Sequence, residues 1–269
     1  MTLLQRYTCN ATLIGLCLAA ASGAYAQGVN TINSAFIHPR VFNDIPGSSL
    51  TVVSNYPSLI SFNDQNVSRT NGGFANRDTW QFSNNGGTSA YQFQNGDYFH
   101  ASMNLTLTAS SLSPRREAGF LFSTASSGDI QFIVNTDGHE VVQFGGISFY
   151  SFLNTAPPVG GYGMTYNSGD LINLGLSYFL AGDGNNALQF FANGNASPVF
   201  EFAPGAGIGN GSTLGGYFQI LNDPLNPLNS GSAAFGNISI SSVPEPSTFA
   251  LLSLGIVTLG AVVSRRRRI

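Results

Sequence analysis

Turn signals punctuate the middle of the sequence at intervals of about 8–12 residues. Each pairs Asn or Asp with Gly, and they fall at residues 71–73, 84–87, 95–97, 137–138, 183–186 and 193–194. Between them lie short runs in which bulky apolar and polar side chains alternate, among them residues 79–82, 91–93 and 129–134. Alternation with a period of two is typical of half-buried strands, and Asn-Gly and Asp-Gly favour hairpin turns. The sequence therefore predicts an all-β fold, an antiparallel β-sandwich or barrel.

The sequence supplies few charged residues for the protein surface. Charged residues make up 9% of the 269 residues, and all ten basic residues are Arg. An average soluble domain has roughly 25% charged residues. A protein that binds nucleic acid needs a basic face to neutralise phosphates, so nucleic acid is excluded as a partner. Exposed helix positions are normally filled by Lys, Glu, Gln and Ala, so the composition also argues against a mostly helical protein.

The apolar patterning divides the chain into a leader and one main domain. Residues 27–75 are rich in Pro, Asn and Ser and are expected to form an irregular leader with one or two strands. Residues 76–241 are expected to form the sandwich. The order of its apolar segments resembles a concanavalin or laminin-G type jelly roll; the segments are residues 117–122, 132–134, 141–145, 171–178 and 235–238. The resemblance implies the fold and leaves the ligand open.

The N-terminus predicts an export signal over residues 1–26. Arg6 supplies a positive start, residues 11–21 are apolar, and small residues precede a cleavage site for signal peptidase between Ala26 and Gln27. Both cysteines of the chain lie inside this signal, so the mature protein is expected to be free of cysteine. An uncleaved N-terminal anchor is the alternative.

An uncharged apolar run near the C-terminus predicts a transmembrane helix at residues 248–264. A helix of this length nearly spans the roughly 30 Å hydrocarbon core. The tail 265–269 follows it and contains four consecutive arginines: Arg265, Arg266, Arg267 and Arg268. The positive-inside rule places this tail in the cytoplasm. The sandwich is therefore expected on the far side of the inner membrane, at the cell surface or secreted.

A linker with a Pro-Glu-Pro triplet, residues 242–247, separates the sandwich from the apolar run; the triplet is Pro244, Glu245 and Pro246. The ordered series of export signal, triplet, short apolar helix and Arg cluster resembles the PEP-CTERM sorting signal of Gram-negative bacteria. The resemblance implies that exosortase, a membrane-embedded enzyme similar to cysteine proteases, cuts near the triplet. Two prolines keep the segment extended, which suits a protease groove. A plain membrane anchor is the simpler alternative.

Few residues of the exported part are suited to catalysis. Three histidines, none at ligand spacing from another, are present: His38, His100 and His139. No Gly-x-Ser-x-Gly motif marks a nucleophile elbow. The exported glutamates do not form the paired pattern of jelly-roll glycosidases; they are Glu117, Glu140 and Glu201. Glu117 is expected to form an ion pair with the neighbouring Arg115 and Arg116 at a strand edge. The chain is therefore expected not to be an enzyme.

Calcium is the one metal that the sequence leaves open, and no other cofactor is expected. Asp and Asn in Gly-rich loops supply the oxygen ligands that calcium takes. The candidates are Asp129, Asp137, Asp183 and Asn185, with Asn186 beside them. The alternative is that these residues are present because tight turns need positive φ angles.

A sugar-binding platform of aromatic side chains is not evident from the spacing. Trp80 alternates with Phe82 in a predicted strand and is expected to lie in the core. Five tyrosines without a distinguishing spacing are the remaining candidates: Tyr91, Tyr150, Tyr162, Tyr166 and Tyr217.

Three functional hypotheses follow from these observations. The first is an exported protein, sorted by exosortase, with a structural or interaction role in the exopolysaccharide or biofilm matrix. The second is a lectin-like module that binds exopolysaccharide with the help of calcium. The third is an enzyme that acts on polysaccharide. Signal peptidase, exosortase, the inner membrane and exopolysaccharide are the expected partners.

Overall fold

The computed structural model describes residues 28–243 except 43, 71 and 154–160. The predicted signal peptide, the triplet Pro244–Pro246, the apolar run and the Arg tail lie outside the described residues. Among the described residues, no helix is both long and apolar enough to cross a membrane. One short 3₁₀ helix, η1 (Val29–Thr31), precedes the strands.

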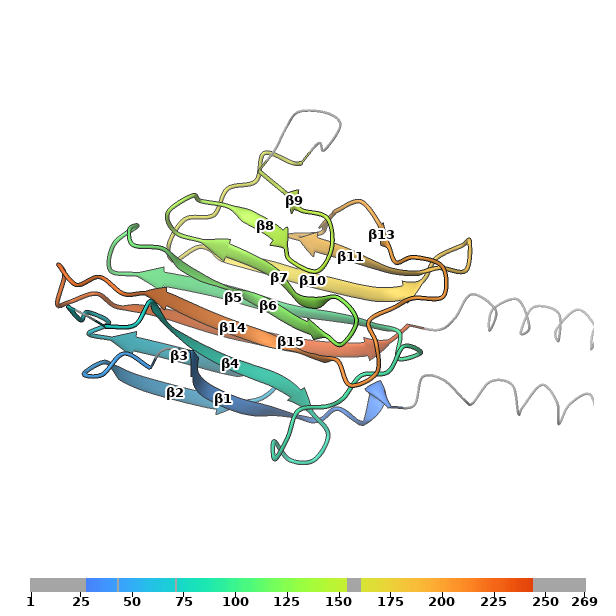
Figure 1. Ribbon diagram of the computed structural model, residues 1–269, viewed down its shortest axis with the longest axis horizontal. Helices are drawn as coiled ribbons and strands as arrows, with labels where there is room; N and C mark the ends of the chain where they lie inside the picture. Colours follow the sequence, from blue (N-terminus) through green and yellow to red (C-terminus); the bar gives the residue numbers. More distant parts are fainter. Residues whose placement is uncertain (1–27, 43, 71, 154–160, 244–269) are drawn as a thin grey trace, which may run out of the picture.

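Two antiparallel sheets pack face to face (Figure 1). In spatial order, the seven-stranded sheet contains β1 (Ser34–Phe42), β4 (Ala75–Ser83), β14 (Thr213–Leu221), β6 (Arg116–Thr124), β7 (Gly128–Asn135), β8 (Val141–Phe144) and β9 (Tyr150–Ser151). The eight-stranded sheet contains β12 (Asn195–Ala196), β11 (Asn186–Ala192), β10 (Leu171–Leu180), β5 (Phe99–Ala109), β15 (Gly231–Ser242), β3 (Leu59–Gln65) and β2 (Ser49–Asn55), with β13 (Phe200–Glu201) paired to β11. The prediction of an all-β antiparallel jelly roll is confirmed.

The core between the sheets follows from the alternation in the sequence. Along β5, every second side chain is buried and apolar, from Phe99 to Leu107, while the residues between them face outward. Trp80 of β4 is fully buried, as expected, and its ring meets the edges of Phe82 and Phe235 at centroid distances of 5.3 and 5.9 Å. Aromatic pairs in this geometry add to the stabilisation that burial provides.

The leader is more regular than its sequence suggests. Residues 34–65 form three strands, and these belong to both sheets: β1 pairs with β4, and β2 and β3 extend the sheet beside β15. Pro39 lies in β1, which is an edge strand, where a missing N–H costs no ladder hydrogen bond on the solvent side. The boundary expected at residue 75 therefore does not separate leader from sandwich, because one sandwich spans residues 34–242.

The two ends of the sandwich differ in charge. We call the end at which the described chain begins and finishes the terminal end, and the opposite one the distal end (Figure 1). All five arginines of the described residues lie toward the distal end, where β1 and β3 finish and β4 and β6 begin: Arg40, Arg69, Arg77, Arg115 and Arg116. Among the described residues, the terminal end holds acidic side chains and no arginine; the acidic residues are Asp97, Asp129, Asp183 and Glu201.

Candidate functional site

A buried polar network lies on the outer face of the seven-stranded sheet, centred on Glu117 of β6. Its Oε1 accepts hydrogen bonds from the Tyr217 hydroxyl at 3.1 Å and from Gln219 Nε2 at 3.0 Å. Its Oε2 accepts one from Arg115 Nε at 2.7 Å. The expected ion pair with Arg115 is therefore present. Arg116 turns inward instead, where its guanidinium donates to Asn229 Oδ1.

A second layer of contacts completes this Glu117 network. Arg77 Nε donates to Gln219 Oε1 at 2.8 Å, and the guanidinium lies 5.3 Å from the centre of the Tyr217 ring. Burial, followed by the neighbouring Glu117, raises the pKa of Tyr217 well above its ordinary value, so the phenol stays protonated and donates. Glu117, Tyr217 and Gln219 are less than 8% exposed. Because both Glu117 oxygens already accept hydrogen bonds, the network stabilises the sheet.

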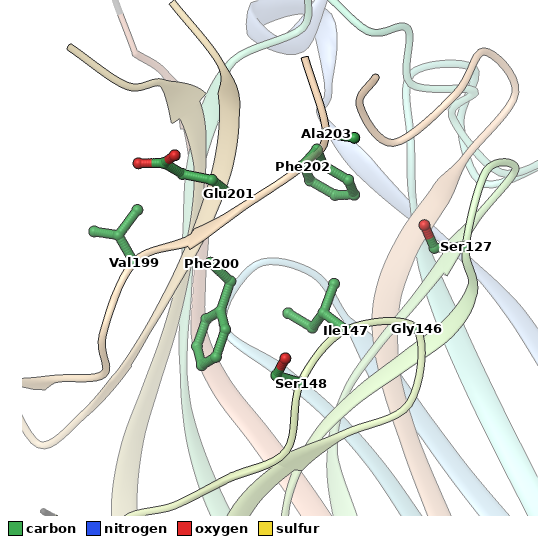
Figure 2. A pocket seen from close by; sticks show the side chains of 9 residues that line it. All are labelled: Ser127, Gly146, Ile147, Ser148, Val199, Phe200, Glu201, Phe202 and Ala203. Atoms are coloured by element: carbon green, nitrogen blue, oxygen red, sulfur yellow. The ribbon is translucent and has the colours of Figure 1, made fainter. Parts of the chain in front are cut away.

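An open hollow lies elsewhere, between the edges of the two sheets near the terminal end (Figure 2). Its volume is about 440 Å³. Three segments that are distant in the sequence form it: the turn before β7, the loop between β8 and β9, and β13 with its flanking residues. The lining residues are Ser127, Gly146, Ile147, Ser148, Val199, Phe200, Glu201, Phe202 and Ala203.

Two phenylalanines form the apolar wall of the hollow. Phe200 and Phe202 point toward Ile147 and Ser148, whereas Val199 and Glu201 project from the other side of the same strand (Figure 2). The Phe200 ring is supported by Phe190 at 5.8 Å and Tyr150 at 6.3 Å, and the Phe202 ring by Tyr178 at 6.2 Å. Both rings are partly exposed, so each holds an apolar surface open to solvent in a fixed orientation.

The opposite wall depends on glycine. Gly145 and Gly146 have φ angles of 77° and 64°, in the left-handed region that L side chains rarely adopt. A Cβ atom on Gly146 would lie 2.5 Å from Ile130 Cγ1. The Gly-Gly sequence therefore permits the tight turn that places Ile147 and Ser148 opposite the phenylalanines.

Glu201 is the one ionisable residue among the nine that line the hollow; its exposed side chain projects from the far side of the strand, and none of the nine is a cation. Asp183 lies close to Glu201, and the pKa of Asp183 is lowered, first by the backbone N–H of Asn185. Hydroxyl groups come from Ser127 and Ser148. The arrangement suits an uncharged ligand that has both an apolar face and hydroxyl groups.

The four calcium candidates lie in three different turns. Asp129 Oδ1 accepts from Ser123 Oγ at 2.7 Å, and Asp137 Oδ1 accepts from the Gly138 N–H at 3.0 Å. Asp183 accepts from Asn185. Within the part of the chain that the structure describes, no three Asp, Glu, His or Cys residues are grouped so that they could hold a metal ion. The structure thus does not bring these candidates together, and each satisfies its own turn.

The tyrosines that were candidates for sugar binding differ in their exposure. Tyr150, Tyr166 and Tyr217 are buried, while Tyr162 is exposed and donates from its hydroxyl to the Ala196 carbonyl at 2.9 Å. None of the five tyrosines lines the hollow. Phe200 and Phe202 were not predicted as site residues, because a phenylalanine within a predicted strand has the same sequence pattern as a core residue.

The end of the chain decides how the protein is sorted. Residues 242–268 match the model of the PEP-CTERM protein-sorting motif. The chain carries an exosortase sorting signal. A PEP-CTERM protein is exported, is held at the membrane through its C-terminus and is processed by exosortase. No curated protein is similar enough in sequence to serve as a relative.

Solved structures resemble the sandwich at low identity. The alginate lyase AlgAT5 of polysaccharide lyase family 7 is 13% identical, with 71% of this chain and 82% of that chain covered and a TM-score of 0.43. The lyase AlyA1 from Zobellia galactanivorans is 10% identical, with 80% and 99% covered and a TM-score of 0.44. The carbohydrate-binding module CBM66 from Bacillus subtilis is 10% identical, with 74% and 98% covered and a TM-score of 0.37. These similarities concern the fold alone.

The structural neighbours correct one expectation. The expectation that the chain is not an enzyme is wrong, because solved structures with a similar fold include alginate and glucuronan lyases. The motifs that were sought, a nucleophile elbow and paired carboxylates, belong to hydrolases. Their absence therefore does not exclude lyase chemistry.

Proposed function

We propose that this exported sandwich binds a polysaccharide of the extracellular matrix by holding neutral sugar units in the hollow. The observation that carries the proposal is the pair of partly exposed rings, Phe200 and Phe202, opposite the loop that holds Ser148. The sorting motif at residues 242–268 supports the proposal, because an exported domain meets polysaccharides outside the cell.

The lining of the hollow matches the two kinds of surface on a sugar ring. The C–H face of a pyranose packs on aromatic rings, and its hydroxyl groups pair with serine hydroxyls and backbone groups. Phe200 and Phe202 are already fixed by their core neighbours, so binding costs little side-chain entropy. A matrix-binding role agrees with a domain whose hollow is open at the sheet edge.

Charge supports a neutral polymer over a polymer of uronic acids. Glu201 is the one charged side chain at the hollow, and Asp183 adds a second carboxylate beside it. The whole chain contains no Lys, and the arginines of the described residues lie toward the distal end. A polyanion at the hollow would therefore meet repulsion without a compensating cation.

Titration calorimetry with neutral oligosaccharides and with alginate oligosaccharides tests the proposal. We expect measurable affinity for at least one neutral series and none for alginate. Phe200→Ala should lower that affinity at least tenfold, about 1.4 kcal/mol, because it removes half of the aromatic wall.

Phe149→Ala is the matched control. Phe149 lies next to Ser148 and is 58% exposed, but it does not line the hollow, so its removal should leave the affinity unchanged. Thermal melting of each variant checks that it is folded. Absence of binding to every neutral series would contradict the proposal and favour a structural role without a sugar ligand.

A further inference from the structure

Among the described residues the two sheets end in four edge strands, and three of these are poor templates for a further strand. β9 and β12 contain two residues each. β1 is longer, but Pro39 lies within it, and its register with β4 shifts between His38 and Phe42. Arg40, inside that shift, has a positive φ of 56°. Short strands, proline and bulges keep a sheet edge from pairing with another chain, so these three edges are protected.

β2, the fourth edge strand, has none of these features (Figure 1). Its seven residues, Ser49–Asn55, include no charged residue, proline or glycine. They pair with β3 without a register shift, and within the described part of the chain β3 is the one strand that pairs with them. Three consecutive β-branched residues, 51–53, favour the extended conformation. The other side of β2 therefore presents an unbroken row of backbone N–H and C=O groups, about 23 Å long.

The side chains of β2 fit antiparallel pairing with the same strand of a second copy. With a two-fold axis at Val52, Thr51 of each copy lies opposite Val53 of the other. Leu50 then lies opposite Ser54. Thr51 and Val53 are both exposed on the outer face, and Leu50 and Val52 pack against the core. The inner and outer faces of the two sheets therefore continue into each other, and no like charges meet in the paired strands.

We infer that β2 is a dimerisation edge: two copies of this chain join β2 to β2 in antiparallel orientation, and their eight-stranded sheets continue into one sheet across a two-fold axis. Charge favours this edge over the rest of the surface. The described residues contain five arginines against twelve of the 13 acidic residues of the chain. Two copies therefore repel each other, and an edge strand without charge is where their backbones can approach.

The dimer leaves the hollow open. The hollow lies at the opposite edge of the sandwich, beside β13 and the loop between β8 and β9, so each copy keeps its own hollow at an outer edge of the dimer. An edge contact of this length is smaller than a standard protein interface. We therefore expect weak association, with a dissociation constant of about 1–100 µM.

Sedimentation velocity of the full-length chain in detergent micelles, at about 5–200 µM protein, tests the dimer. We expect the native chain to change from one copy to two copies per particle as its concentration rises. Thr51→Lys/Val53→Lys places lysines opposite lysines in the paired strands and should raise the dissociation constant at least tenfold. Both native side chains are exposed, so the variant should fold, and its thermal melting checks this.

Thr51→Lys/Val53→Glu is the matched control. It has charged residues at the same two positions, but antiparallel pairing now places each lysine opposite a glutamate of the other copy. The dimer should therefore persist in this variant and weaken as the salt concentration rises. A second control, Thr108→Lys, changes an exposed residue on the outer face of β5, two strands away from the edge, and should also leave the dimer intact.

Four results would overturn the inference. The first is a native chain that stays monomeric over the whole concentration range, and the second is a dimer that persists in the double-lysine variant. The third is loss of the dimer in the folded lysine–glutamate variant, because antiparallel pairing requires that this variant associates. The fourth is loss of the dimer in Thr108→Lys, which would move the contact from the edge to the face of the sheet. Sugar binding enters none of these measurements, so the inference and the proposed function can fail separately.

Discussion

Two glutamates of the same sandwich occupy opposite surroundings. Glu117 is buried on the outer face of the seven-stranded sheet, where three side chains donate hydrogen bonds to its two oxygens. Glu201 is exposed beside the hollow, and the charged group next to it is another carboxylate, Asp183. Tyr217 contacts Glu117, and two phenylalanines flank Glu201 in the sequence. The types of neighbouring residue therefore do not distinguish the two glutamates. The comparison indicates that the first carboxylate stabilises the fold and that the second shapes what the hollow accepts.

The largest expected effect is on stability. Glu117→Ala should lower the free energy of unfolding by about 2 kcal/mol, because it leaves the buried Gln219 amide without its acceptor. Tyr217 keeps Gln131 Oε1 as an acceptor at 2.6 Å, and Arg115 keeps its longer contacts with two other carboxylates. Glu201→Ala should change it by less than about 0.5 kcal/mol. Urea unfolding of the two variants measures both values. Equal losses would show that the distinction between the two glutamates is wrong.

A buried pair of aspartates extends the comparison to the pH dependence of stability. Asp64 is buried beside Asp78 with one cation, Arg40, whose Nη2 lies 3.0 Å from Asp64 Oδ1. Burial raises the pKa of Asp64 to about 6, from an ordinary value of 3.8, and burial also raises the pKa of Asp78. Between pH 3.8 and about 6, Asp64 keeps a proton in the folded protein, whereas the same side chain releases it in the unfolded chain. Stability should therefore fall as the pH rises from about 4 to 6, by roughly 1–3 kcal/mol.

Urea unfolding at several pH values between 4 and 7 tests this prediction. Asp64→Asn, which keeps an acceptor for Arg40, should flatten the profile relative to the native protein. A stability that rises over the same interval in the native protein would contradict the assignment. It would mean that Arg40 and the Asn76 amide outweigh the cost of burying Asp64.

Two glycines allow the effect of backbone strain to be separated from the effect of the loop that lines the hollow. Gly128 and Gly146 both have positive φ, 77° and 64°, but a Cβ atom meets nothing within 4 Å at Gly128 and Ile130 at 2.5 Å at Gly146. Alanine at either position should cost about 1 kcal/mol of stability through backbone strain. Gly146→Ala should in addition move the loop of Ile147 and weaken sugar binding several-fold. Equal affinities in the two variants would contradict this role of the loop.

The smallest expected effect concerns selectivity. Glu201→Gln should leave the affinity for neutral oligosaccharides within about twofold, because the carboxylate projects from the far side of β13. It should also reduce the repulsion of alginate oligosaccharides, most visibly at low salt. The two affinities, measured at 20 and 200 mM salt, check both expectations. A large loss of neutral-sugar binding would place Glu201 in direct contact with the ligand.

The strands that form the core were the predictable part of the fold. β4, β10 and β11 follow from alternation and from the Asp-Gly turn at residues 183–186, and the burial of Trp80 was expected. One or two strands were expected in residues 27–75, and the structure has three, β1, β2 and β3. β1 and β2 are edge strands, which present more polar side chains and tolerate proline, so their pattern is weak in the sequence. The hollow could not be predicted, because residues 127, 146–148 and 199–203 meet only once both sheets have formed.

The measurement that tests the central claim most directly is a chemical-shift titration of the isotopically labelled protein with the neutral oligosaccharide that binds best. The account predicts amide shifts concentrated at Ile147, Ser148, Phe200 and Phe202, with Glu117 and Tyr217 unchanged. Shifts centred on Glu117 and Tyr217, with the hollow unaffected, would contradict it and move the binding site to the outer face of the seven-stranded sheet.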